Sequence, residues 1–228
     1  MSTLSGVIQS APPGLLGVDA DSPLSSADAQ QLFALGYRFC GRYLSLSTPQ
    51  KDGDLSTQEA TSIIGAGLAL VPVQHVLEPG WSPRRELGTA HGQAALRNAQ
   101  QLGIPFGVNV WCDLEGIAKD TAGQDIIDYC HAWYDAVDAQ GKGYVPGLYV
   151  GYDARLSMEQ LREALPFQHY WGGVLATPVA EPGTQLLQLL PLNRRLWGVE
   201  VRVDVDVTLA NASPHSMKWL ALEAPPCK

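Results

Sequence analysis

Positive charge is scarce in this chain of 228 residues, in which 15 Lys and Arg stand against 23 Asp and Glu. The resulting formal net charge of -8 repels phosphate backbones and anionic membrane surfaces, so nucleic-acid binding is disfavoured. Cysteine is also scarce, and the 4 cysteines form no CxxC pair. Their spacing excludes a disulfide scaffold and gives no zinc or redox motif, so we expect small buried side chains at Cys40, Cys112, Cys130 and Cys227.

Long apolar runs are absent as well. The nearest one, residues 186–192, is interrupted by Gln188 and Pro191 and is too short to cross a bilayer, so we expect no membrane span. No Lys or Arg occurs before Arg38, and no long apolar stretch precedes it, so the pattern of a secretory signal is missing. We therefore expect synthesis in the cytoplasm without a signal peptide. Action in the periplasm or cell wall would then require export by a non-classical route.

The apolar residues that are present recur in a fixed order along the chain. A short β-branched or aromatic run is followed by a polar loop and then by an amphipathic stretch that ends near Gly, which is typical of βα units. The expected strands are residues 15–20, 37–46, 68–76, 107–114, 144–152, 169–176, 184–190 and 199–207. The expected helices are residues 25–35, 57–66, 85–102, 124–139 and 158–165.

This alternation predicts an α/β fold, a TIM-like (β/α)8 barrel formed by residues 1–228 as one domain. The sequence between the last three expected strands is too short for full helices, so we expect abbreviated helices in those units. A doubly wound open sheet is the rival architecture, and a nucleotide-binding version of it would need a Gly-rich phosphate turn. Neither GxGxxG nor GxxxxGK[ST] occurs in the chain.

Acidic residues follow three of the expected strands, at the face of a parallel barrel where chemistry collects. They are Asp19, Asp21, Asp113, Glu115, Asp204 and Asp206. Side chains alternate across a strand, so Asp113 and Glu115 share the face toward the barrel axis, while Cys112 and Leu114 face the helices.

Mutual repulsion and partial burial should raise the pKa of one carboxyl group of this pair, so that one group is an acid and the other a base at neutral pH. Glycoside hydrolysis uses such a pair of carboxyl groups. Helix capping or simple exposure to water is the alternative role for each single acid. A Mg²⁺ or Ca²⁺ site is a further alternative, because both ions prefer oxygen ligands.

Aromatic and polar residues accompany the acids on the same expected strands. Flat rings at Tyr43, Tyr149, Tyr152 and Trp171 are suited to the apolar faces of sugars, although ordinary barrel packing also accounts for them. Three polar residues in apolar strands need buried partners, which a network around the acids would supply; they are Arg42, Gln74 and Gln188. His75 alternates to the side opposite Gln74, and we expect a core histidine there.

Several short motifs resemble those of the family 25 glycoside hydrolases, the Chalaropsis-type lysozymes. They are Gly17-Val18-Asp19, Asp113-Leu114-Glu115, Pro146-Gly147-Leu148-Tyr149, Trp171, Gln188 and Val203-Asp204-Val205-Asp206. Residues 36–39, 41–44, 146–151 and 169–171 resemble more closely a bacterial glycoside-hydrolase-like domain family related to these lysozymes. The resemblance runs from about residue 14 to residue 208.

The resemblance implies a peptidoglycan muramidase that cleaves the β-1,4 bond between N-acetylmuramic acid and N-acetylglucosamine. By matched position, Glu115 would be the general acid, Asp113 would orient the substrate's acetamido group, and Asp19 and Asp204 would be supporting carboxylates. The residues that would bind the sugar are Tyr43, Arg42, Gln74, Tyr149, Trp171 and Gln188, with Asp21 and Asp206 as second-rank candidates.

No cofactor or metal ion is implied by the resemblance. The expected partners are peptidoglycan or a related glycan, together with a secretion apparatus or an immunity protein if the chain is an injected antibacterial effector or a lysis enzyme. Two other functions stay open: a non-catalytic glycan-binding module with the same barrel, and a metal-dependent enzyme that chelators would inhibit.

Overall fold

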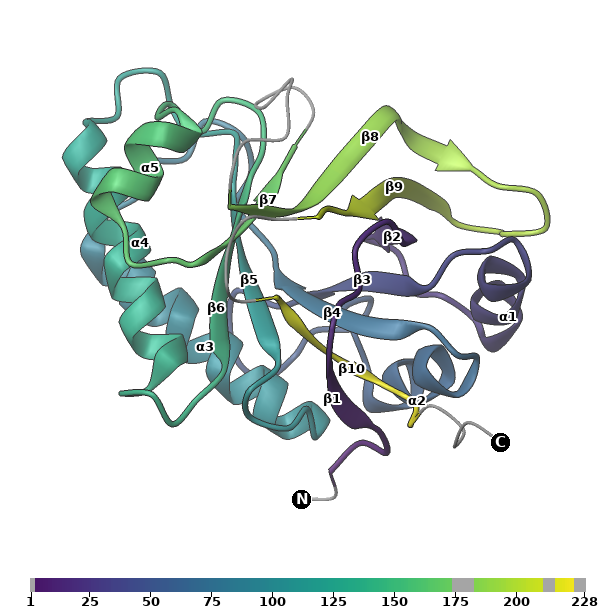
Figure 1. Ribbon diagram of the computed structural model, residues 1–228. Coiled ribbons are helices and arrows are strands. Elements are labelled where there is room, and N and C mark those ends of the chain that lie inside the picture. Colours follow the sequence, from purple (N-terminus) through teal and green to yellow (C-terminus); the bar gives the residue numbers. More distant parts are fainter. Residues whose placement is uncertain (1–2, 174–182, 211–215, 224–228) are drawn as a thin grey trace.

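The computed structural model describes residues 3–173, 183–210 and 216–223, and its centre is a closed barrel of eight strands (Figure 1). The barrel strands are β2 (Leu16–Ala20), β3 (Phe39–Leu44), β4 (Ala69–Gln74), β5 (Asn109–Leu114), β6 (Val145–Val150), β7 (His169–Gly172), β8 (Thr184–Arg195) and β9 (Arg202–Thr208). Each pairs with the next, β9 returns to β2, and the pairing of β4 with β5 completes the ring. The TIM-like α/β barrel expected from the sequence is confirmed.

Five helices lie between successive strands from β2 to β7 and cover the outside of the barrel. They are α1 (Ser26–Ala34), α2 (Thr57–Gly65), α3 (Arg85–Leu102), α4 (Gly123–Asp138) and α5 (Met158–Ala164). The side chain of Ser25 caps α1 by accepting the backbone N–H of Asp28, which satisfies an otherwise unpaired donor of the first turn. In the described ranges, no helix has the length and apolar character that a membrane span requires.

Two apolar clusters follow from the alternation of side chains along the strands. One fills the barrel interior, where Trp111 and Trp171 cross at 83° with ring centroids 5.8 Å apart. The other lies between the strands and the helices, and it contains Cys40, Cys112 and Cys130 as small buried side chains. Cys227 lies outside the described residues.

The sheet is mixed, which corrects the expectation of an all-parallel barrel. Strand β9 runs antiparallel to both of its neighbours, β2 and β8, so residues 203–206 do not form the carboxyl end of a parallel strand. The turn between β8 and β9 holds no helix, whereas an abbreviated one was expected from the short connection. Part of the expected strand 169–176 lies outside the described residues, and its described portion is β7.

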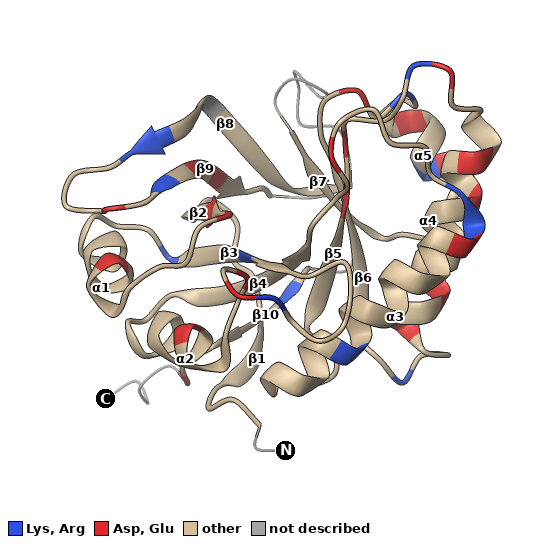
Figure 2. Cartoon of the chain, turned by 180° about the vertical axis from the view of Figure 1, so that it is seen from behind, with Lys and Arg blue, Asp and Glu red and all other residues tan. Residues whose placement is uncertain are grey.

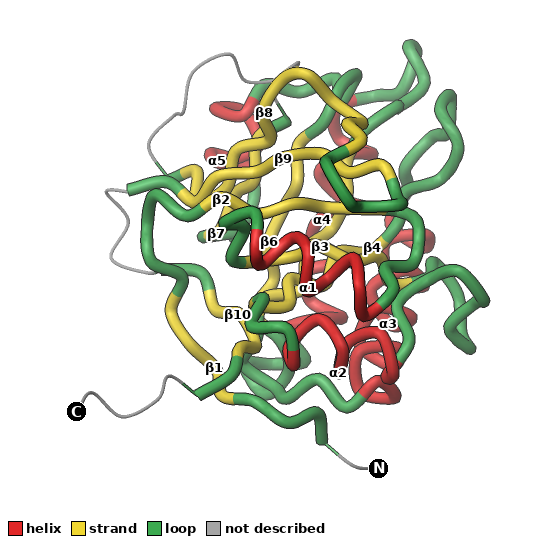
Figure 3. The backbone as a smooth tube through the Cα atoms, turned by 90° about the vertical axis from the view of Figure 1, so that its right-hand side faces the viewer, coloured by secondary structure: helices red, strands yellow, loops and turns green. Residues whose placement is uncertain are grey.

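Two further strands were not expected from the sequence. Strand β1 (Val7–Ser10) pairs with β10 (Lys218–Ala221), and the two run side by side in Figure 3. Leu220 of β10 pairs with Leu70 of β4, while Trp219 packs against Phe39 at a centroid distance of 5.6 Å. These strands therefore close the amino-terminal end of the barrel and leave the opposite end open.

Candidate active site

A cavity of about 260 Å³ lies at the open end of the barrel. Its lining comes from strands around most of the barrel and from the loops that follow them: Tyr43, Glu115, Tyr149, Tyr152, Gly173, Gln188, Leu192, Asn193 and Asp204. Side chains reach it from the carboxyl ends of parallel strands and, on one side, from β8 and β9. Ligand sites of barrels of this type lie at this end.

Asp19 lies beneath this cavity, on β2, with 4% of its surface exposed. The Tyr43 hydroxyl donates to its Oδ1 at 3.3 Å, and Gln188 Nε2 donates to its Oδ2 at 3.1 Å. Burial, together with the charge of Asp204, raises the pKa of Asp19 to about 6, although hydrogen bonds limit the rise. Asp19 is therefore a carboxyl group that changes charge near neutral pH.

Asp113 and Glu115 share the interior face at the end of β5, as the alternation predicted. Asp113 is 5% exposed, and its Oδ1 has no hydrogen-bond partner among the described residues. Burial and the charges of Glu115 and Asp19 raise its pKa well above the usual range. Burial, followed by the charges of Asp19 and Asp204, raises the pKa of Glu115 to about 7. The pair therefore keeps a proton at pH values where ordinary carboxyl groups are ionised.

Glycine at position 151 makes room for the side chain of Glu115. A Cβ atom at this position would lie 2.1 Å from Glu115 Oε2 and 2.8 Å from the Tyr149 ring. Any other residue would push Glu115 away from β6, so Gly151 determines where the half-buried carboxyl group stands. Gly151 lies in the segment 146–151 that resembles the related family, and its role depends on a contact that the sequence does not reveal.

Asp204 and Asp206 on β9 lie at two depths in the barrel. Because β9 runs antiparallel to β2 and β8, Asp204 is the one nearer the cavity. Asp204 pairs with Asp19 across the strands and lines the cavity, where it accepts the Asn193 backbone N–H and the Gln188 amide at 3.3 Å. Burial raises its pKa. Asp206 lies deeper, fully buried, and accepts Trp171 Nε1 at 3.0 Å; burial and the charge of Asp19 raise its pKa well above the usual range.

The predicted aromatic residues take two different positions. Tyr43 and Tyr149 line the cavity, and the Tyr149 hydroxyl donates to Gln188 Oε1 at 3.1 Å. Trp171 does not line it, since its ring is 1% exposed and packs against Tyr149 at a centroid distance of 5.1 Å. Trp171 was expected to contact the sugar, but it lies beneath the cavity and supports the ring of Tyr149. Tyr152, the fourth aromatic residue expected here, is exposed at the rim of the cavity.

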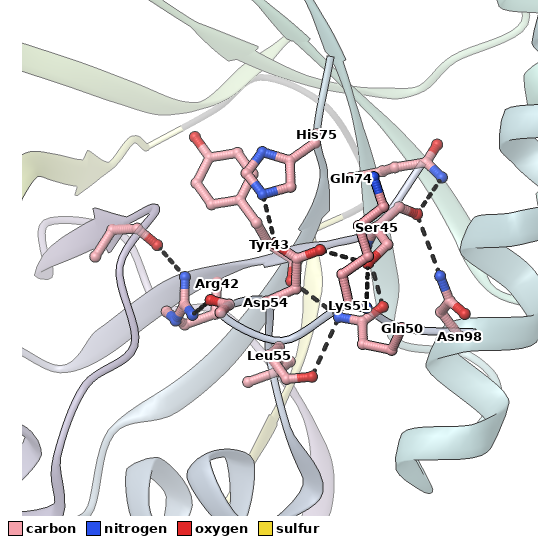
Figure 4. Close-up of polar contacts among 12 residues, drawn as sticks. Arg42, Tyr43, Ser45, Gln50, Lys51, Asp54, Leu55, Gln74, His75 and Asn98 are labelled. Atoms are coloured by element: carbon pink, nitrogen blue, oxygen red, sulfur yellow. Dashed lines mark hydrogen bonds and ion pairs between the residues drawn. The ribbon is translucent and has the colours of Figure 1, made fainter. Parts of the chain in front are cut away.

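Arg42 and Gln74 were expected to bind substrate, but neither lines the cavity, and Figure 4 shows hydrogen bonds from both to other residues. Arg42 is buried on the outer side of β3, where its Nε lies 2.6 Å from Glu59 Oε1. Gln74 Nε2 donates to the His91 carbonyl at 2.8 Å, and its Oε1 accepts Trp133 Nε1 at 2.7 Å. Both side chains face the helices because they alternate with interior residues, and their partners come from distant loops and helices.

Asp21 and His75 also differ from expectation. Asp21 is exposed in the loop after β2 and is not among the residues that line the cavity. The His75 side chain is 32% exposed, so it is not a core histidine; its Nε2 lies 2.8 Å from Asp54 Oδ1. Figure 4 shows its ring against that of Tyr43, at 4.4 Å and 20°. His75 thus supports an aromatic wall of the cavity.

A closed eight-stranded barrel with buried carboxyl groups gathered at one mouth belongs to the class of TIM-like barrels. Residues 30–208 match the family model of the Rv2525c-like, glycoside hydrolase-like domain. The chain therefore belongs to this family, and the resemblance found in its motifs is confirmed. A search of curated proteins gave no match.

Solved structures support the same fold. The Tat-secreted protein Rv2525c of Mycobacterium tuberculosis, in complex with L-tartrate, superimposes with a TM-score of 0.67 at 18% identity, over 91% of this chain and 100% of that one. A family 25 glycosyl hydrolase from Bacillus anthracis gives a TM-score of 0.60 at 13% identity, over 93% and 96%. The bacterial lysozyme of Streptomyces coelicolor gives 0.53 at 14% identity, over 89% and 95%. The fold is thus related to that of the family 25 lysozymes.

Proposed function

We propose that this chain is a muramidase that hydrolyses the β-1,4 bond between N-acetylmuramic acid and N-acetylglucosamine in peptidoglycan. The observation that carries the proposal is the pair Asp113 and Glu115, which share one strand face and have raised pKa values. Glu115 lines a cavity with tyrosine walls, and Asp113 is buried at the same strand end without lining the cavity itself. A binding site for a neutral sugar gains nothing from two carboxyl groups that repel each other, whereas glycoside hydrolysis requires such a pair.

Glu115 is the general acid in this mechanism. With a pKa of about 7 it is still protonated in a substantial fraction of molecules at neutral pH and lines the cavity, so it can protonate the glycosidic oxygen as the bond to the anomeric carbon breaks. A water molecule then adds to the anomeric carbon and a proton returns to Glu115. The reaction needs no redox partner.

The other carboxyl groups hold the substrate and stabilise the positive charge that develops on the sugar ring. Asp113 orients the acetamido group next to the reacting carbon. Asp19 and Asp204 are linked through the Gln188 amide, which donates to both, and supply negative charge beneath the ring. Tyr43 and Tyr149 provide the walls on which the sugar lies.

The proposed substrate determines where this chain would act. Peptidoglycan lies outside the cytoplasm, and the similar protein Rv2525c is described as Tat-secreted. We therefore extend the proposal to export into the periplasm or cell wall. A secretion apparatus and, for an antibacterial effector, an immunity protein would be the corresponding partners.

The test is release of soluble muropeptides from purified peptidoglycan, read by mass spectrometry. The proposal predicts products with muramic acid at the reducing end, unaffected by a chelator and absent with Glu115→Gln and with Asp113→Asn. The exposed Asp135→Asn, on α4, is the matched control and should keep full activity. Folded protein that retains glycan but releases nothing would show a binding module, and loss of activity with chelator would show a metal-dependent enzyme.

A further inference from the structure

A hairpin arm, residues 192–203, extends beyond the cavity at the outer ends of β8 and β9. Figure 1 shows it projecting from the barrel toward α1. Its far end is fixed there, because Gln31 donates to the Trp197 carbonyl at 3.1 Å and the Glu200 backbone N–H donates to Asp28 at 2.7 Å. The hairpin arm is therefore a platform held at both ends.

Positive charge is concentrated on this hairpin arm, in blue on β8 and β9 in Figure 2. Arg195 lies directly opposite Arg202 across the two strands, an arrangement of like charges that destabilises a strand pair. Each guanidinium donates to a backbone carbonyl, at 3.2 Å to Glu200 and 2.9 Å to Asn193. Within the described part of the chain neither forms an ion pair, so both charges are available to an anion.

This arginine pair continues the lining of the cavity. Arg202 precedes Asp204 by two residues on β9, so both side chains belong to the same strand face, and Asp204 lines the cavity. Asn193, whose carbonyl holds Arg202, is itself part of the lining. A polymer that leaves the cavity along β9 therefore reaches the two arginines next.

An unpaired aromatic ring lies at the end of the same path. Trp197, in the turn of the hairpin arm, is 86% exposed, although burial of such a ring is strongly favourable in water. Flat indole rings stack on the apolar faces of sugars, and guanidinium groups bind carboxylates. The cavity is acidic and the whole chain carries a net charge of -8, so both repel an anionic polymer. Arginines beside the cavity offset that repulsion.

We propose that the hairpin arm is a distal subsite for an anionic glycan polymer, in which Arg195 and Arg202 bind carboxylates of the polymer's side groups and Trp197 stacks on a sugar ring. The inference rests on the proposed function for the identity of the polymer. In peptidoglycan the carboxylates belong to the peptide stems attached to muramic acid. An uncharged glycan such as chitin offers no such partner to the arginines.

The experiment measures binding of the full chain carrying Glu115→Gln to insoluble peptidoglycan by co-sedimentation, at low and at high salt. Adding Arg195→Gln with Arg202→Gln should weaken binding about tenfold at low salt and remove most of its salt dependence. Trp197→Ala should weaken binding to a similar degree at both salt concentrations. Chitin binding should not change with the arginine substitutions.

The matched control removes the same charge at the other end of the barrel. Arg97→Gln with Lys142→Gln alters two exposed residues near the amino-terminal ends of the strands and should leave peptidoglycan binding unchanged. The inference would be overturned by equal losses of binding in both double variants or by unchanged binding in the hairpin arm variants. It would also be overturned if the chain carrying Glu115→Gln alone did not bind peptidoglycan. Loss of binding to anionic phospholipid vesicles alone would instead make the hairpin arm a membrane surface. Muropeptide release by the chain with Glu115 tests the proposed function separately.

Discussion

Replacing Asp19 by Asn is expected to stabilise the fold above neutral pH while removing activity. Burial beside Asp204 raises the pKa of Asp19 from 3.8 to about 6. The unfolded chain ionises at the lower value and the folded protein at the higher one, so rising pH penalises the folded state between them. That difference corresponds to roughly 3 kcal/mol of unfolding free energy at high pH and to none at low pH, where both states are protonated.

This figure is an upper limit for the substitution. Asn keeps the shape of Asp19 and one acceptor oxygen, but it cannot accept from Tyr43 and Gln188 on two carboxylate oxygens. The assay is urea unfolding of the wild type, Asp19→Asn and the exposed control Asp135→Asn, at about pH 8 and about pH 4. A gain in unfolding free energy at the higher pH that shrinks at the lower pH supports the reasoning. An equal change at both, or a loss at the higher pH, refutes it.

Three more predictions follow from the site. The pH–rate profile should decline as pH rises through about 7, where Glu115 loses its proton, and a rate that stays constant well above this pH would remove Glu115 as the acid. Gly151→Ala should lower turnover at least about tenfold in a folded protein, because its Cβ would displace the Glu115 carboxyl group; unchanged kinetics would contradict that contact. Arg42→Met should lower the unfolding free energy by about 3–5 kcal/mol, because Glu59 would remain buried without its partner, and denaturation showing no loss would refute this.

The fold and the central acid pair could be predicted because they depend on local periodicity. Alternation along β5 places Asp113 inside and Cys112 outside whatever the rest of the chain does, and the same holds for Asp19 on β2. Strand direction has no such local signal. The antiparallel course of β9 depends on its connection to β8, and it is what brings Asp204 to the cavity and Asp206 beneath it.

The failed expectations have two physical causes: alternation along β3 and β4 places Arg42 and Gln74 on the outer face, and their partners come from other elements. Arg42 and Gln74 are polar residues in apolar strands, as a site would require, yet their partners Glu59 and Trp133 come from helices outside the barrel. Strands β1 and β10 have four residues each and pair across almost the whole chain, so periodicity cannot reveal them.

The most direct test of the central claim is a carbon-13 NMR titration of the Glu115 carboxyl group in the folded protein, assigned by comparison with Glu115→Gln. Burial among the charges of Asp19 and Asp204 predicts a midpoint at about 7 for this group. A midpoint at the ordinary value of 4.5 would mean that Glu115 is ionised at neutral pH, and it would contradict its role as the proton donor.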